Sequence, residues 1–172
     1  STGMASLDEV REALNVALKY GCGDVLLFHC ISSCPAITEE SNLNNLTWLR
    51  QKFGVEVGLS DHTTNNIAAL TAIGMGAVAI EKHFKLDDEE CGPDSSFSLK
   101  IDELFKLVNE CNDAWNAKGT ISFNRALSES KNMIFRRSLY FVNSLKKGQK
   151  ISKQHIRRIR PGFGLPPKYF DR

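Results

Sequence analysis

The feature that most constrains this chain is the regular alternation of helical and strand-like segments over its first 119 residues. Ser6 and Glu9 form a capping-box pattern, and apolar residues then recur at helical spacing until Gly21. Short, continuous apolar runs separate this segment from later ones of the same kind. The pattern predicts helices at about 7–20, 42–53, 65–75 and 101–119, and strands at 24–30, 55–60 and 77–83. Such alternation predicts right-handed βαβ units and a parallel sheet.

Three complete strands, with a possible stub ending at Ser1, make too small a parallel sheet to stand alone. Its open edges would be exposed, so we expect part of a doubly wound sheet or of a (β/α)8 barrel. A length of 172 residues would by itself fit one domain, with or without a small appendage. The start at Ser1, without Met or an apolar leader, suggests processing or a cut from something longer.

The charges divide the chain into two parts. Residues 1–130 carry 10 Lys and Arg against 19 Asp and Glu, whereas residues 131–172 carry 12 against the single Asp171. A polar, aperiodic stretch lies between them, and a strand is expected at 134–142. We therefore predict a first domain at 1–119, a linker at 120–133 and a second domain beginning at 134. The ending from Arg160, rich in Gly and Pro, is unsuited to a helix.

Composition argues against membrane and disulfide-rich classes. The longest run of low polarity, residues 67–80, is shorter than a bilayer span and predicts a helix, a Gly turn and a strand. Five cysteines form an odd number without a CxxC pair, which argues against a disulfide framework or a zinc knuckle. A cytoplasmic protein without a membrane partner is the simplest expectation.

Polar residues at the expected strand ends are the first candidates for a site, because parallel α/β folds bind ligands there. His29, His62 and His83 all fall at this edge. His62 and His83 are 21 residues apart, which places them on neighbouring strands about 5 Å apart. Two imidazoles with an acid nearby suit Mn, Fe, Co or Zn, although a histidine at a strand end is more often a hydrogen-bonded structural residue.

Small hydroxyls and acids surround the same edge. Ser1, Ser32 and Ser60 could bind a phosphate, or they could simply be loop residues. The candidate catalytic acids are Asp61, Glu81 and Asp94, and Asp94 could equally be a turn residue. Cys30 and Cys34 could be nucleophiles, but Cys30 ends an apolar strand and is better explained by buried packing.

The basic second part raises a different function, the binding of nucleic acid or another polyanion. Its clusters are Arg136-Arg137 and Arg157-Arg158-Ile159-Arg160. An aromatic stacking platform and a groove-reading helix motif are not apparent, so nucleic acid is an unfavoured partner. A solvated face or a contact between subunits is the more common role of such clusters.

Eight motifs, collinear and spread over nearly the whole chain, resemble the sialic acid synthase family. They are Ser1-Thr-Gly-Met4, Leu27-Phe-His-Cys30 with Pro35, Gly58-Leu-Ser-Asp-His-Thr63, Ile80-Glu-Lys-His-Phe84, Gly92-Pro-Asp94 with Phe97-Ser-Leu99, Arg137-Ser-Leu139, Lys146-Lys-Gly148 and Arg160-Pro-Gly162. The resemblance implies an α/β chain made of the C-terminal half of a (β/α)8 TIM barrel followed by the start of a small antifreeze-like (SAF, β-clip) domain.

The resemblance also implies an activity. These transferases condense phosphoenolpyruvate with an open-chain acetamido sugar, use a divalent metal such as manganese, with magnesium or cobalt as alternatives, and release phosphate. They are homodimers in which the second domain caps the partner's active site. Half a barrel should accordingly be inactive in isolation.

Residue roles follow from the resemblance position by position. His62 and His83 match the metal ligands, Ser1, Ser32 and Ser60 match the phosphate contacts, and Glu81 and Asp94 match acids near the metal and sugar. Arg160 matches an arginine delivered by the partner's cap. Position 32 is often Asn in the family, and Cys34 replaces the usual Tyr at the sugar.

Two segments of the sequence favour one branch of the family over the others. The ending Phe163–Tyr169 and the segment Ser95–Leu99 resemble the pseudaminic acid branch of the family more than the N-acetylneuraminate branch. Legionaminate and spore-coat polysaccharide synthases of the same family remain alternatives, as does a different barrel enzyme such as a metal-dependent aldolase or hydrolase.

Overall fold

The computed structural model describes residues 1–86 and 92–171, which divide into two compact units. Unit 1 comprises residues 1–120 and unit 2 residues 121–172. Within the described residues, no helix combines the length and the apolar character of a membrane span.

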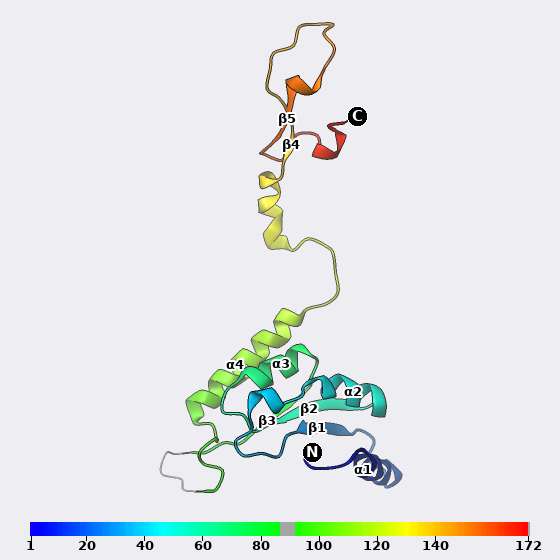
Figure 1. Cartoon of the computed structure of the whole chain (residues 1–172), viewed down its shortest axis with the longest axis vertical. Helices are drawn as coiled ribbons and strands as arrows, with labels where there is room; N and C mark the ends of the chain where they lie inside the picture. Colours follow the sequence, from blue (N-terminus) through cyan, green and yellow to red (C-terminus); the bar gives the residue numbers. More distant parts are fainter. Residues whose placement is uncertain (87–91, 172) are drawn as a thin grey trace. The chain divides into compact units, whose positions relative to one another are not determined.

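Unit 1 has the α-β-α-β-α-β-α order that the sequence pattern predicts (Figure 1). Its helices and strands are α1 (Leu7–Lys19), β1 (Leu26–Cys30), α2 (Asn44–Phe53), β2 (Glu56–Asp61), α3 (Ile67–Gly74), β3 (Ile80–Lys82) and α4 (Ile101–Lys118), with a 3-10 turn η1 (Thr38–Glu40) before α2. The strands pair in parallel in the order β1-β2-β3. The expected parallel sheet and α/β class are confirmed.

Local signals in the sequence account for where the elements begin and end. The capping box at the start of α1 forms, since Glu9 N–H donates to Ser6 Oγ and the Ser6 N–H donates to the Glu9 carboxylate. Gly54 ends α2 in the left-handed conformation with φ 67°. Gly76, with φ 98°, makes the turn between α3 and the approach to β3.

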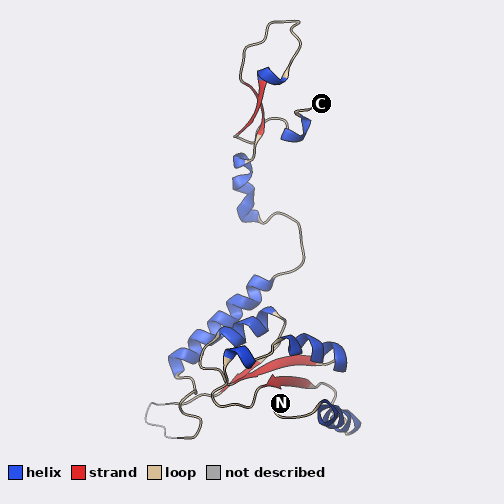
Figure 2. Cartoon of the chain, in the orientation of Figure 1, coloured by secondary structure: helices blue, strands red, loops and turns tan. Residues whose placement is uncertain are grey.

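The core of unit 1 lies between one face of the sheet and the helices that cover it (Figure 2). Val57 and Leu59 of β2 are buried there, and they pack against Leu46 of α2 and Ala68 of α3. Because side chains alternate along a strand, Gly58 and the residues at even positions of β2 lie on the opposite face. One face of the sheet therefore packs against the helices in the core, and the side chains on the other face are not part of that core.

Strand β3 is shorter than the expected 77–83. Val78 and Ala79 still bond to β2 before it, since Val78 N donates to Val57 O and Leu59 N to Ala79 O. After it, the chain pairs with a returning segment, where Leu99 N donates to the His83 carbonyl. The residues just after β3 are thus hydrogen-bonded to Leu99, which lies further along the chain.

Unit 2 contains a two-stranded antiparallel sheet of β4 (Ser138–Phe141) and β5 (Ile156–Ile159). Three 3-10 segments accompany it, η2 (Leu127–Phe135), η3 (Lys153–His155) and η4 (Pro167–Tyr169). The strand expected at 134–142 is wrong in its extent, because η2 occupies its first residues and β4 begins at Ser138. Arg136 N donates to Met133 O and Gly162 N to Ile134 O, which removes these carbonyls from a strand ladder.

Candidate active site

The carboxyl edge of the sheet brings polar residues of neighbouring strands into one row on the face away from the helices. Cys30 of β1 is in register with Ser60 of β2, and Ser60 is in register with Glu81 of β3. Ser60 is buried and its Oγ donates to Glu81 Oε1 at 2.8 Å. Because Ser60 and Glu81 are paired positions on neighbouring strands, their hydroxyl and carboxylate lie side by side on one face of the sheet.

His62 and His83 lie one pleat further along the same face. Their ring centroids are 5.0 Å apart with the ring planes tilted by 53°. Both residues are half-buried. The buried ring of Phe97 packs edge-on against His83, with centroids 4.9 Å apart, and lies 6.2 Å from the His62 ring.

The segment that returns after β3 brings an acid to this pair. Phe84 bridges to Leu99, so residues 94–98 are held beside the end of β3. Asp94 Oδ2 lies 3.6 Å from His83 Nδ1. His83 and Asp94 also line a hollow of about 440 Å³ together with Ser95 and Ser98.

The first residues of the chain lie on the other side of the row. Thr2 N donates to Phe28 O at 2.8 Å, which sets the N-terminal segment beside β1. A Cβ placed on Gly3 would lie 2.0 Å from Ser32 Oγ and 2.9 Å from Cys30 Sγ, so the backbone at Gly3 lies close to both side chains. Ser1 and Ser32 are both exposed at this end.

Cys30 connects the two halves of the row. Its Sγ lies 3.5 Å from Ser32 Oγ and 3.8 Å from His62 Nδ1. The structure therefore links Ser32, His62, His83 and Asp94 through neighbouring contacts, with the Ser60–Glu81 pair in the same row.

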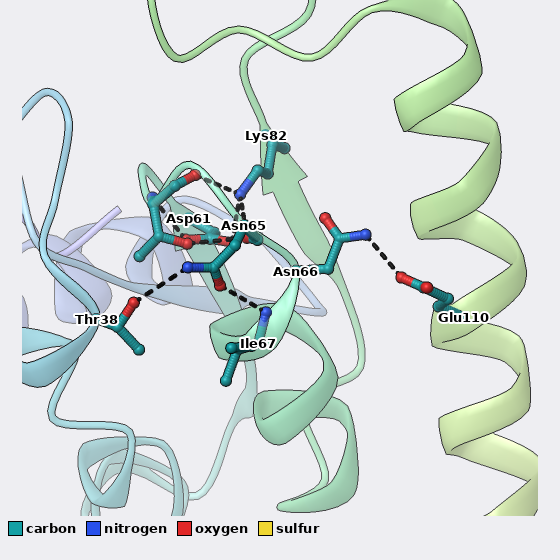
Figure 3. Close-up of polar contacts among 8 residues, drawn as sticks. Thr38, Asp61, Asn65, Asn66, Ile67, Lys82 and Glu110 are labelled. Atoms are coloured by element: carbon teal, nitrogen blue, oxygen red, sulfur yellow. Dashed lines mark hydrogen bonds and ion pairs between the residues drawn. The ribbon is translucent and has the colours of Figure 1, made fainter.

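Asp61 does not join this row. It lies on the opposite face, where its Oδ2 accepts a 2.7 Å bond from Lys82 Nζ and its Oδ1 accepts one from Thr63 N (Figure 3). The Asp61 and Lys82 side chains are only 2% and 3% exposed. Both carboxylate oxygens are engaged in structural contacts, which argues against the catalytic role expected from the sequence.

Three other residues named from the sequence lie outside this row of contacts. His29 is buried and its Nε2 lies 2.8 Å from the Ser41 carbonyl, so it is the structural histidine that the alternative interpretation anticipated. Cys34 is exposed. Arg160 belongs to unit 2, where it is exposed after β5.

The contacts made by Phe97, Cys30 and Lys82 were not predicted from the sequence. Cys30 is buried as expected, but it also contacts Ser32 and His62. Strand alternation could have revealed Lys82, because a residue between Glu81 and His83 must lie on the other face, as Asp61 does between Ser60 and His62. No comparable signal marks Phe97, whose position depends on the return of the chain after β3.

The donor atoms of the histidine pair fit a divalent metal of the first transition row. Two imidazoles with a nearby carboxylate suit Mn, Fe, Co or Zn. Within the described residues, no group of three or more His, Cys, Asp and Glu residues is arranged as a metal cluster. The pair would therefore supply two ligands and leave positions for water or substrate.

Polar side chains at the carboxyl edge of a parallel sheet define the class of α/β proteins that bind ligands at their strand ends. Within this class, residues 1–122 match the NeuB family model. The chain belongs to the NeuB family, which confirms the resemblance drawn from its motifs.

Sequence similarity to known synthases supports this assignment to the family. A pseudaminic acid synthase of Campylobacter jejuni is 37% identical over 171 residues, covering 99% of this chain and 50% of that protein. An N,N'-diacetyllegionaminic acid synthase of the same organism is 39% identical over 174 residues, covering 99% and 52%. The chain thus spans about half the length of these relatives.

A solved structure supports the fold. The N-acetylneuraminic acid (sialic acid) synthetase of Leptospira borgpetersenii, in complex with citrate, superposes with a TM-score of 0.68 at 31% identity. The alignment covers 76% of this chain and 46% of that one.

Proposed function

We propose that this chain is part of a transferase that condenses phosphoenolpyruvate with an open-chain acetamido sugar to form a nonulosonic acid and releases phosphate. The observation that carries the proposal is the His62–His83 pair beside Ser60, Glu81 and Asp94 in a member of the NeuB family. Relatives named for pseudaminic and legionaminic acids support this class of product. We favour pseudaminic acid because residues 95–99 and 163–169 resemble that branch, with N-acetylneuraminate, legionaminate and spore-coat synthases as alternatives.

The row of side chains suits this reaction. Ser1, Ser32 and Ser60 offer hydroxyls for the phosphate of phosphoenolpyruvate, and fixing it aligns the enol carbon with the sugar. Glu81 and Asp94 could stabilise the positive charge that develops on the enol ether carbon, or direct the water that adds there. No covalent nucleophile is required.

His62 and His83 would hold the divalent metal. We propose manganese, with magnesium or cobalt as alternatives. Such an ion supplies Lewis-acid polarisation of the sugar carbonyl when bound. The Phe97 ring, which packs edge-on against His83, would restrict the orientation of that imidazole.

The architecture belongs to the same proposal. Residues 1–119 would form the C-terminal half of a (β/α)8 barrel, and residues 134–172 the start of an antifreeze-like domain. In a homodimer that domain would bring Arg160 to the partner's site. Coverage of half of each relative supports a second half that supplies further substrate contacts. The cysteine content supports a cytoplasmic location.

Phosphate release by the gene product that contains residues 1–172 tests this function. Release should require phosphoenolpyruvate, an acetamido sugar and metal together, and His62→Ala and His83→Ala should each lower it at least about 100-fold. His155→Ala is the matched control, since His155 lies in unit 2 and contacts Ser152. Residues 1–172 alone should be inactive. Sugar-independent release, or full activity in His62→Ala, would contradict the proposal, and turnover of another substrate would favour a different barrel enzyme.

Polyanion binding by unit 2 is the weaker alternative. Arg158 and Lys153 both pair with Asp171, and the Arg158 guanidinium lies 4.0 Å from the centre of the Phe170 ring. These internal contacts reduce the charge available to a nucleic acid. Salt-sensitive binding to DNA or RNA that is lost on changing Arg157 and Arg160 would reinstate this function.

A further inference from the structure

A buried charge pair joins β2 and β3 on the face of the sheet opposite the histidines. Lys82 Nζ lies 2.7 Å from Asp61 Oδ2, and both side chains are almost completely buried. Removing two charges from water is costly, and a buried ion pair is by itself weak evidence for a gain in stability. The contacts of this pair indicate another role.

Lys82 uses its ammonium group to hold the turn that follows β2. Besides Asp61, Lys82 Nζ donates to the carbonyl of Thr63 at 2.6 Å and to that of Asn65 at 3.0 Å. Asp61 Oδ1 accepts a bond from Thr63 N at 2.9 Å. The pair therefore fixes the backbone on both sides of His62.

Asparagine side chains secure the same turn to its surroundings (Figure 3). Asn65 Oδ1 accepts from Ile67 N at 2.9 Å, at the start of α3. Asn66 Nδ2 donates to Glu110 Oε2 of α4 at 2.7 Å. The His62 carbonyl itself accepts a 3.0 Å bond from Ala36 N. The turn is held from several elements, with a lysine at its centre.

Lys82 is also the residue between Glu81 and His83. Its backbone belongs to the strand that carries His83, whereas its ammonium group holds the turn that carries His62. One side chain thus couples the two histidines from behind the sheet without touching either.

We propose that Lys82, with Asp61, is a positioning residue that sets the placement of His62 relative to His83. This inference rests on the proposed function, in which the two imidazoles bind one metal ion. Partners that orient metal ligands commonly change metal affinity by about 10- to 100-fold when they are removed.

The decisive variant removes both charges. Lys82→Met alone would leave the Asp61 carboxylate buried without its partner, which can unfold a protein. Asp61→Asn/Lys82→Met avoids that charge and keeps an oxygen for the Thr63 N–H, while it removes the lysine's bonds to the two carbonyls. Arg50→Met is the matched control, because Arg50 also bridges β2 and the approach to β3, through Glu56 and the Gly76 carbonyl, away from the histidines.

Two measurements on the gene product that contains residues 1–172 test the inference. In a Co²⁺ titration followed by absorbance, the double variant should bind about 10- to 100-fold more weakly than wild type, and Arg50→Met should bind normally. In the metal-free protein, the NOE between the ring protons of His62 and His83 should weaken in the double variant and persist in Arg50→Met.

The outcomes separate this inference from the proposed function. If wild type binds no Co²⁺, the proposed function loses its metal site and the NOE alone decides the positioning role. A folded double variant with wild-type NOE and affinity overturns the inference. A double variant that does not fold, or an equal loss of affinity in Arg50→Met, overturns it in favour of a purely structural role.

Discussion

At the scale of single residues, a shift of one position along β2 or β3 changes what a side chain does. Ser60 and Glu81 face the candidate site, whereas the side chains of Asp61 and Lys82 beside them are buried on the opposite face. Motif letters give no indication of this difference. The alternation of side chains along a strand does, and it separates the acid expected to work in catalysis from the acid that holds the structure.

Cys111 of α4 illustrates how burial changes reactivity. Burial raises the pKa of the Cys111 thiol, and the nearby charges of Glu110 and Asp61 raise it further. Alkylation requires the thiolate, whose fraction at pH 8 falls as the pKa rises. Iodoacetamide should therefore label Cys111 more slowly than the exposed Cys22 and Cys34, as peptide mass spectrometry would measure.

The control for this labelling experiment is the unfolded chain. In denaturant the cysteines lose their environments and should react at similar rates. Equal rates of labelling in the folded protein would contradict the raised pKa.

At the scale of elements, the order and type of segments in unit 1 could be predicted because each has its own local signal. The capping box of α1, Gly54 after α2 and the apolar run of β1 require no knowledge of the rest of the chain. The end of β3 and the extent of β4 could not be predicted, because they depend on partners distant in sequence. Leu99 N donates to the His83 carbonyl just after β3, and Gly162 N donates to the Ile134 carbonyl before β4.

The candidate site divides in the same way. Spacing alone predicted that His62 and His83 lie on neighbouring strands, and their rings do lie 5.0 Å apart. It could not separate them from His29, which is structural because Ser41 happens to present its carbonyl. The approach of Asp94 likewise depends on the path of the chain after β3.

Gly58 tests how closely β2 packs against its neighbours. A Cβ there would lie 2.8 Å from both Ala79 O and Phe28 Cε1. Because strand backbone cannot easily move, Gly58→Ala should lower the free energy of unfolding by about 1–3 kcal/mol, measured by urea denaturation.

Gly74 at the end of α3 is the matched control. A Cβ there meets no atom within 4 Å, so Gly74→Ala should raise the free energy of unfolding by about 0.5 kcal/mol. A destabilisation as large as that of Gly58→Ala would show that loss of glycine, rather than crowding in β2, is responsible.

At the scale of the whole molecule, the chain consists of two units with opposite charge. The acidic first part carries the histidine pair, and the basic second part carries Arg160. In the proposed function the basic part is the cap, and its positive charge would attract anionic substrates. Within unit 2, Asp171 neutralises part of that charge by pairing with Lys153 and Arg158.

The segment between the last helix of unit 1 and η2 should be the preferred site of proteolysis. Ile121 and Phe123 are fully exposed, and exposed segments without regular structure are cut first. Limited chymotrypsin digestion should cleave after Phe123 before it cleaves after the buried Phe97. Mass spectrometry of the early fragments would check this, and early cleavage within unit 1 would contradict it.

The division of β2 and β3 into two faces also has an evolutionary consequence. Asp61 and Lys82 are fitted to one another, so a change at either position should persist only when the other changes with it. In the proposed function, residues of the opposite face hold the metal and the phosphate, which synthases of different sugars have in common. Within this family, positions 61 and 82 should therefore vary together, while the residues that determine the sugar should lie at other positions.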